Sequence, residues 1–260
     1  MKIAIVIPYY KATLSESEKI SYQSYKKYLS KFDTYWVGPT GVRPPIRSAK
    51  TVLFDPTFFI SVHGYSQLLL TTNFYQAFAK YDYILIFQLD ALVFSNSLDS
   101  WARNGYDYIG APLWSSAIGF LSSPIGGFSH VGNGGLSLRR VTTMIQILET
   151  VQKTKKRKTS SRWLPWIWFA VAVLMGRSRT AWLQSDAINY PFNEDGFWSF
   201  EAQKYAKGYK KPSIKESAKF AIETKPEKAI EILKGQLPFG IHAFDKYQSM
   251  VFFKPVSKVV

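Results

Sequence analysis

Two short, uninterrupted apolar runs, Ile3 to Ile7 and Tyr83 to Phe87, constrain the fold of this chain most strongly. A strand buried on both faces has no polar positions, so such runs are typical of parallel sheets covered by helices. Between the runs, the pattern predicts a helix at 15–31 with Ser15 or Ser17 as N-cap, strands at 34–37 and 51–54, and a helix at 65–81. This alternation predicts an α/β fold with a central, mostly parallel sheet flanked by helices.

The rest of the chain is less regular, but 260 residues fit a single domain over 1–260. A glycine-rich segment, 126–140, leads into a predicted helix at 141–154, and Asn193-Glu194-Asp195 opens another at 196–207. In α/β sheets of this kind, ligands bind beyond the carboxyl ends of the strands. We therefore expect the functional site at that edge of the sheet.

The chain carries 33 Lys and Arg against 18 Asp and Glu, a formal net charge of +15, and no cysteine. The lack of cysteine excludes disulfides, zinc–thiolate sites and cysteine nucleophiles. The surplus of positive charge indicates an anionic partner, whether nucleic acid, anionic lipid or a phosphate-bearing substrate. The first apolar run is shorter than the core of a signal peptide, and no cleavage site of small residues follows it. We therefore expect a cytoplasmic protein.

Residues 153–179 interrupt the globular pattern with a basic and apolar insertion. They contain eight Lys and Arg and no acid, so more than half of the net charge lies in 27 residues. Their apolar part, 163–175, contains three Trp and would span about 20 Å as a helix, short of the roughly 30 Å hydrocarbon core. Aromatic rings beside cations are typical of membrane interfaces, so we predict contact with an anionic membrane surface. The alternative is a buried helix after a solvated basic linker.

Nucleic acid is the less favoured partner, because the aromatic residues form an apolar block instead of alternating with the basic ones. We therefore predict that the chain does not bind nucleic acid.

Two candidate segments for the site follow from the predicted strands. Asp90 comes directly after the run at 83–87, where a carboxylate is costly unless it binds a metal, a cation or several hydrogen-bond donors. Glycines 132, 134 and 135, followed by Arg139 and Arg140, allow a ligand to approach the backbone closely. The alternatives are a carboxylate that caps a turn and a tight loop before a helix.

Two further candidates lie later in the chain. Of Glu194 and Asp195, one is able to act as a general base while the other orients a hydroxyl, although adjacent acids are also common helix caps. His242 lies in an apolar loop, where a histidine is more often a core residue than a ligand. With Asp90 it makes a chemically reasonable site for Mn²⁺ or Mg²⁺. The sequence shows no Walker loop, dinucleotide fingerprint or GxSxG motif.

The order of these motifs resembles the GT-A superfamily of nucleotide-sugar glycosyltransferases, the β-1,4-galactosyltransferase type in particular. More closely, FQLDALVF, YDYIGAP, GNGGLSLRR, NEDGFWS and PFGIHAF look like a bacterial family of uncharacterised, glycosyltransferase-like proteins from polysaccharide and lipopolysaccharide gene clusters. The resemblance covers about Lys2 to Phe244, apart from the insertion. It implies a GT-A-like single domain that transfers a sugar from a nucleotide donor.

The resemblance also implies roles for single residues. Asp90 matches the last acid of the DxD motif, which binds the metal, and His242 matches the late metal ligand. Asp195 matches the catalytic base, and Glu194 its neighbour. The donor contacts fall on Pro8, Tyr9, Gln88, Asp90, Gly134 and Gly135. Arg139 or Arg140 would be further donor contacts on physical grounds, because the charge that develops on a departing diphosphate needs cations. The first acid of DxD is Gln88 here, which keeps hydrogen bonding but adds no charge.

We therefore expect a hexosyltransferase, dependent on Mn²⁺ or Mg²⁺, that lies peripherally on the inner face of the cytoplasmic membrane. It would move a sugar from a UDP-sugar to a lipid-linked or cell-surface glycan such as an O-antigen, with inversion at the anomeric carbon. Gln88 favours the alternative of a non-catalytic nucleotide- or carbohydrate-binding module on the same fold. A nucleic-acid binder driven by net charge is a third hypothesis.

Overall fold

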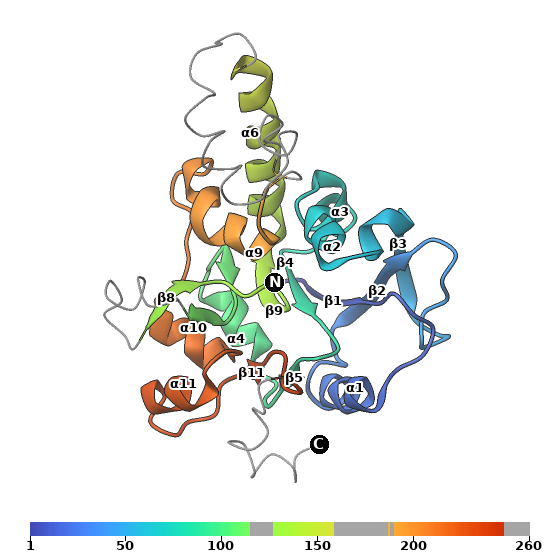
Figure 1. The fold of residues 1–260 in the computed structure, drawn as a ribbon, viewed down its shortest axis with the longest axis vertical. Helices are drawn as coiled ribbons and strands as arrows, with labels where there is room; N and C mark the ends of the chain where they lie inside the picture. Colours follow the sequence, from blue (N-terminus) through green and yellow to red (C-terminus); the bar gives the residue numbers. More distant parts are fainter. Residues whose placement is uncertain (115–126, 159–186, 188–189, 247–260) are drawn as a thin grey trace, which may run out of the picture.

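The computed structural model describes residues 1–114, 127–158, 187 and 190–246. Its central sheet consists of β1 (Ile3–Pro8), β2 (Asp33–Pro39), β3 (Lys50–Phe54), β4 (Tyr83–Phe87), β6 (Tyr108–Ile109) and β9 (Leu136–Arg140). Their order across the sheet is β3-β2-β1-β4-β9-β6, and Figure 1 labels the first five of these strands. The first four strands are parallel, and β9 runs antiparallel to both of its neighbours. The expected mostly parallel α/β sheet is confirmed.

Helices cover both faces of this sheet. On one face, Ile3, Ile5 and Ile7 pack in a core with side chains of the helices α1 (Glu16–Tyr28), α4 (Leu98–Arg103) and α10 (Ile214–Phe220). On the other face, Ala4 and Val6 share a core with side chains of α2 (Val62–Leu68), α3 (Thr72–Gln76) and α6 (Val141–Lys158). Alternate residues of β1 thus enter two separate cores, which explains its uninterrupted apolar run.

A small second sheet brings three distant segments of the chain together. Its strands are β5 (Leu92–Val93), β10 (Ala221–Ile222) and β11 (Gly240–Ile241), in the order β10-β11-β5. Ile241 pairs with Leu92 on one side and with Ile222 on the other. Asp90, Glu223 and His242 lie within two residues of these pairs, so the sheet places all three at one end. The remaining described elements nearby are β7 (Pro112–Trp114), β8 (Phe128–Val131) and α11 (Pro226–Ile232).

The helix expected at 65–81 is two helices, α2 and α3, preceded by the short 3₁₀ helix η1 (Pro56–Phe59). Thr71 separates them, because its hydroxyl donates to the Leu68 carbonyl at 2.8 Å and accepts from the Phe74 N–H at 3.2 Å. Threonine starts a new helix in this way when its side chain replaces a backbone partner. The prediction of one continuous helix was wrong for this reason.

The helix expected at 196–207 is also irregular. The chain forms the single turn α9 (Glu194–Gly196), the π turn η3 (Phe197–Glu201) and the 3₁₀ turn η4 (Ala202–Lys204). Ser199 ties this segment to β8, since its Oγ donates to the Val131 carbonyl at 2.6 Å. Turns of the π type are frequent at functional sites, and this one directly follows Glu194 and Asp195.

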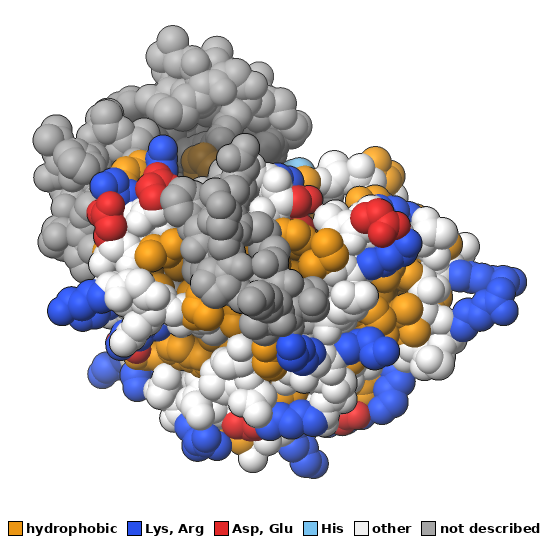
Figure 2. Space-filling view, turned by 90° about the horizontal axis from the view of Figure 1, so that it is seen from below, with side chains coloured by type: hydrophobic (Ala, Val, Ile, Leu, Met, Phe, Trp, Pro, Cys, Tyr) orange, Lys and Arg blue, Asp and Glu red, His pale blue; other side chains and the backbone are white. Residues whose placement is uncertain are grey.

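The predicted helix at 141–154 continues to Lys158, and α6 projects away from the rest of the molecule (Figure 1). Beyond residue 158, the insertion predicted at 153–179 lies outside the described residues. Among the described helices, none is both long and apolar enough to cross a membrane. On the face shown in Figure 2, Lys and Arg side chains outnumber Asp and Glu around the periphery.

Candidate functional site

A cavity of about 810 Å³ lies at the carboxyl ends of β1 and β4, where an α/β sheet places its ligand. Segments that follow both strands line it, together with the start of α2, the glycine loop before β9, the start of α9 and the end of the small sheet. Nine of the predicted site residues lie in its wall: Pro8, Tyr9, Gln88, Asp90, Gly134, Gly135, Glu194, Asp195 and His242.

His242 and Asp90 form an ion pair in the wall of this cavity. The Nε2 atom of His242 lies 3.1 Å from Asp90 Oδ1 and 3.1 Å from Gln88 Oε1. Burial by itself lowers the pKa of His242, but Asp90 and Glu223 outweigh it and raise the pKa to about 9. Burial by itself raises the pKa of Asp90, but His242 and Lys246 outweigh it and lower the pKa. Both members of the pair are therefore charged at neutral pH.

Glu223 and Lys246 are site residues that no sequence motif revealed. Glu223 follows β10, lines the cavity and places Oε1 at 3.4 Å from the Nδ1 atom of His242. It becomes a neighbour of His242 only through the pairing of β10 with β11. Lys246 is exposed and lies 3.9 Å from Asp90 Oδ2. The one feature of the sequence that could have indicated Lys246 is its position four residues after His242.

Two glycines of the loop before β9, Gly134 and Gly135, make room for ionisable side chains. A Cβ atom on Gly134 would lie 2.2 Å from Glu194 Oε1, and one on Gly135 would lie 1.9 Å from His242 Nε2. Any side chain at either position would therefore collide with a predicted site residue. The sequence assigned these glycines to the approach of a donor sugar. In the structure they are needed first for the packing of Glu194 and His242 against the loop.

Arg139 lies beneath the cavity and not in its wall. Its side chain is fully buried and pairs with Glu194 Oε1 at 2.9 Å. It also donates to the Tyr75 hydroxyl at 2.9 Å, to Ser137 Oγ at 3.0 Å and to the Gly134 carbonyl at 3.3 Å. The prediction that Arg139 contacts the donor is therefore corrected: these bonds occupy its guanidinium, and they hold Glu194 and the glycine loop together.

Arg140, the second basic candidate, is also directed away from the cavity. Its Nε lies 3.1 Å from Asp107 Oδ1, and its Nη2 donates to the Gly105 carbonyl at 2.8 Å. Among the described residues of the cavity wall, the basic side chains are Lys11 and Lys246 together with His242.

Glu194 and Asp195 are neighbours with different surroundings. Glu194 is buried, and its second oxygen accepts a hydrogen bond from Ser66 Oγ at 3.0 Å. Asp195 accepts a hydrogen bond from the Gly196 N–H at 2.7 Å. Burial and the charge of Glu194 raise the pKa of Asp195 to about 7. A carboxylate with such a pKa is suited to accept a proton near neutral pH, whereas Glu194 is occupied by its buried partners.

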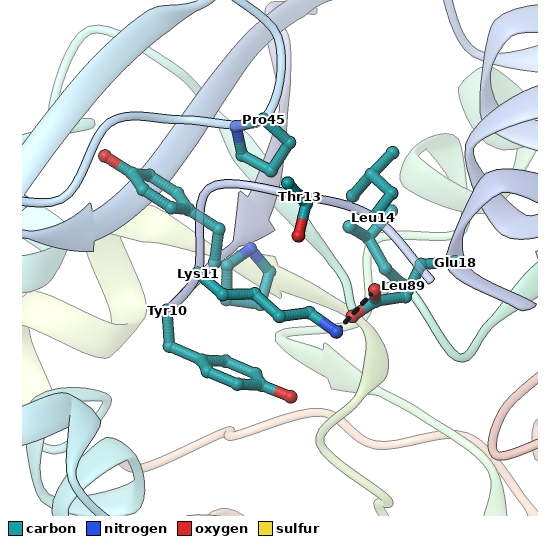
Figure 3. A pocket seen from close by; sticks show the side chains of 9 residues that line it. Tyr10, Lys11, Thr13, Leu14, Glu18, Pro45 and Leu89 are labelled. Atoms are coloured by element: carbon teal, nitrogen blue, oxygen red, sulfur yellow. Dashed lines mark ion pairs between the residues drawn. The ribbon is translucent and has the colours of Figure 1, made fainter. Parts of the chain in front are cut away.

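The wall after β1 exposes a different tyrosine from the one predicted to contact the donor. Tyr9 is buried, with its ring on Gly38 and its hydroxyl donating to the Val42 carbonyl at 3.1 Å. Tyr10 is 64% exposed and offers an aromatic face to the cavity. A narrow side pocket continues from this wall, where Lys11 forms an ion pair with Glu18 at 2.8 Å (Figure 3).

The donor atoms around His242 fit a divalent metal ion that is shared with a ligand. Adjacent ligands of an octahedral ion, each about 2.1 Å from it, lie about 3 Å apart. The Nε2 atom of His242 lies at that distance from both Asp90 Oδ1 and Gln88 Oε1. Within the described residues, no group of three or more His, Asp and Glu is arranged to hold a metal. Asp90, Gln88 and a deprotonated His242 would supply at most three donor atoms, so Mg²⁺ or Mn²⁺ held here would need water and phosphate oxygens to complete its coordination.

A family model described as "Protein of unknown function (DUF5672)" matches residues 48–242. The chain belongs to this family. The part shared with the DUF5672 family includes Gln88, Asp90, the glycine loop, the Glu194-Asp195 pair and His242, but not the wall after β1. A search of curated proteins gave no match in sequence.

Solved structures resemble this member of the DUF5672 family over nearly its whole length. Mouse xyloside xylosyltransferase 1, in its apo form, has a TM-score of 0.52 at 12% identity and covers 93% of this chain and 97% of its own. An active-site mutant of LgtC has a TM-score of 0.50 at 10% identity and covers 98% of this chain and 95% of its own. At such low identity the likeness concerns the fold, and it confirms the expected GT-A-like architecture.

Proposed function

We propose that this chain is a glycosyltransferase that moves a sugar from a nucleotide-sugar donor, a UDP-sugar, to a glycan hydroxyl. One observation carries the proposal: a single cavity contains both Asp195, with a pKa of about 7, and the metal-compatible pair of Asp90 and His242. Asp195 is suited to activate a hydroxyl, and the pair of Asp90 and His242 is suited to hold a cation that binds a diphosphate. The fold, which is shared with mouse xyloside xylosyltransferase 1, is consistent with sugar transfer.

The donor would lie across the carboxyl ends of β1 and β4, with its diphosphate near Asp90 and Lys246. When bound there, a divalent cation would supply positive charge for the departing diphosphate. Lys246, at 3.9 Å from Asp90 Oδ2, adds a second positive charge on the same wall. The exposed ring of Tyr10 is available to the nucleobase.

Asp195 would accept the proton of the acceptor hydroxyl as the oxygen attacks the anomeric carbon. In the same step the bond from that carbon to the diphosphate oxygen breaks, and the electron pair leaves with the diphosphate. A single displacement of this kind inverts the configuration of the anomeric carbon. Glu194, held by Arg139 and Ser66, would position Asp195 and keep its pKa high.

The acceptor would be a lipid-linked or cell-surface glycan, approached on the inner face of the cytoplasmic membrane. Ile60 and Val62 support an apolar portion in the acceptor, since they are 80% and 72% exposed and line the cavity. Two caps hold this turn in place: Asp55 accepts from the Thr57 N–H, and Ser61 accepts from the Gly64 N–H. The basic and Trp-rich segment 153–179 supports contact with anionic lipid.

Thermal unfolding with a panel of nucleotide-sugars, followed by transfer assays with the selected donor, tests the proposal, because a ligand of the folded state raises the melting temperature. Asp195→Asn should lower transfer by at least about 100-fold while the donor still stabilises the protein. Asp99→Asn is the matched control, because Asp99 is a surface residue paired with Lys31. Transfer at the wild-type rate by Asp195→Asn would contradict the assignment of the base. Donor binding without turnover in the wild type would favour the non-catalytic module.

A further inference from the structure

We infer that Glu223 is a positioning residue that supplies, through His242, the negative charge that Gln88 lacks beside Asp90. This inference rests on the proposed nucleotide-sugar site, and it concerns how that site binds its metal. A pair of acids separated by one residue would place two carboxylates next to a cation. In this chain the first position is the neutral Gln88, and the second carboxylate of the cluster comes from another strand.

The small sheet determines where Glu223 lies. Ile222 of β10 pairs in parallel with Ile241 of β11, so the residues that follow them, Glu223 and His242, leave the sheet side by side. The backbone N–H of His242 donates to the Ile222 carbonyl at 2.8 Å, which fixes this register. Asp90 lies on the opposite side, just before β5, which pairs with β11. The imidazole therefore lies between two carboxylates from different strands.

Contacts on three sides hold the His242 ring. Glu223 Oε1 lies 3.4 Å from Nδ1, and Asp90 Oδ1 lies 3.1 Å from Nε2. The backbone of Gly135 supports the ring, because a Cβ atom there would lie 1.9 Å from Nε2. Binding of a cation at Nε2 would release the proton that this nitrogen carries in the charged imidazole, while the Nδ1 proton stays on the side of Glu223. A carboxylate at one imidazole nitrogen orients the ring and strengthens the other nitrogen as a metal ligand.

Glu223 forms no ion pair other than the one with His242 among the described residues. Its side chain is only 12% exposed, and among the described residues no Lys or Arg forms an ion pair with it. A largely buried carboxylate is costly unless it is paired, and within the described residues the partner of Glu223 is His242, so its charge acts on this imidazole. One imidazole away from the cation, its charge adds to that of Asp90 and gives the cluster two negative charges.

Binding of Mn²⁺ to the full chain, measured by electron paramagnetic resonance of the free ion and by calorimetry, tests this role without any assay of transfer. Glu223→Gln should weaken Mn²⁺ binding by about 10- to 100-fold. The double variant Glu223→Gln with Gln88→Glu should recover most of that loss, because Gln88 Oε1 already lies 3.1 Å from His242 Nε2. Glu231→Gln is the matched control, since Glu231 is an exposed acid paired with Lys228.

Unchanged Mn²⁺ binding in Glu223→Gln would overturn the inference, and so would a loss that Gln88→Glu leaves unrepaired. Glu223→Asp provides a second variant that keeps the charge, and it should bind more tightly than Glu223→Gln. Thermal unfolding without metal verifies that each variant is folded. If Glu223→Gln transfers sugar and binds Mn²⁺ normally, this inference is wrong and the proposed function stands. If the variants bind Mn²⁺ with the expected loss and rescue but the protein turns over no nucleotide-sugar, the proposed function is wrong and this inference stands.

Discussion

Glu194 and Asp195 are adjacent acids whose environments differ because they lie at the start of a helical turn. Successive side chains there project in different directions. Glu194 projects into the protein, where Arg139 and Ser66 bind both of its oxygens. Asp195 lies beside it without a basic partner among the described residues, and its pKa rises to about 7 because of burial and the Glu194 charge. At the scale of the residue, the different surroundings of Asp195 and Glu194, and not their residue types, thus make Asp195 the proposed base and Glu194 the residue that positions it.

The raised pKa of Asp195 predicts the pH dependence of transfer. We expect kcat/KM to fall about tenfold per pH unit below a midpoint close to 7, because the protonated acid cannot accept the acceptor proton. The measurement is kcat/KM from pH 5 to 9 for the wild type and for Asp99→Asn, which should share the midpoint. A midpoint near 4 in both would mean that another group, or an unshifted carboxylate, governs the rate.

The same pKa shift has the opposite sign for stability. The pKa of Asp195 is higher in the folded state than the usual 3.8, so the folded state binds more protons between about pH 4 and pH 7. The contribution of this group to the free energy of unfolding is therefore fully present at low pH and is lost as the pH rises to 7. Stability at this residue is greatest where the proposed base is inactive.

At the scale of the element, the loop between β8 and β9 packs against the residues of the proposed site. Two of its three glycines contact proposed site residues: Gly134 lies against Glu194, and Gly135 lies against His242. The loop itself is held by the Arg139 side chain and by the Gln88 N–H, which donates to the Gly135 carbonyl at 2.9 Å. The glycine loop therefore links the proposed base and the proposed metal ligand.

The two glycines should respond differently to alanine. Gly135→Ala should weaken Mn²⁺ binding at least about 10-fold, because the new methyl group displaces the His242 ring that we propose as a ligand of the ion. Gly134→Ala should act mainly on stability, because it displaces Glu194 from its buried pair with Arg139. Urea unfolding and Mn²⁺ titration of both variants compare the effects. Normal Mn²⁺ affinity in Gly135→Ala would show that the ring finds another position.

At the scale of the whole molecule, the net charge of +15 is unevenly distributed along the chain. More than half of it belongs to residues 153–179, whose first six residues form the projecting end of α6. The cavity wall, in contrast, carries more acids than bases. Most of the surplus positive charge therefore lies outside the cavity wall. We propose that its main part contacts an anionic membrane surface.

Replacement of the six bases Lys153, Lys155, Lys156, Arg157, Lys158 and Arg162 by Ser tests this assignment. Each base near an anionic surface contributes about 1 kcal/mol, so binding to phosphatidylserine vesicles should fall at least about 100-fold. A control variant removes six exposed lysines elsewhere, Lys19, Lys26, Lys27, Lys215, Lys228 and Lys234. Vesicle sedimentation at constant salt compares the two. Equal losses in both variants would contradict a local role, and preference for random DNA over vesicles would restore the nucleic-acid hypothesis.

Local patterns predicted the elements whose structure depends on nearby residues. The apolar runs became β1 and β4, and Ser15, one of two proposed caps, starts α1 in a capping box with Glu18. The break at Thr71 was missed because the apolar positions on both sides continued at helical spacing. The motif order also indicated nine residues that share one cavity, since the carboxyl ends of adjacent parallel strands meet at one edge.

By itself, the sequence determined the fold class, the edge of the sheet that bears the cavity and the location of the excess charge, because these depend on periodicity and local composition. Only the tertiary structure decided that Arg139 is buried and pairs with Glu194, that Tyr10 and not Tyr9 is exposed, and that Glu223 lies beside the Nδ1 atom of His242. These facts depend on strand pairing between residues far apart in the chain and on which side chains lose their contact with water. No local pattern carries either kind of information.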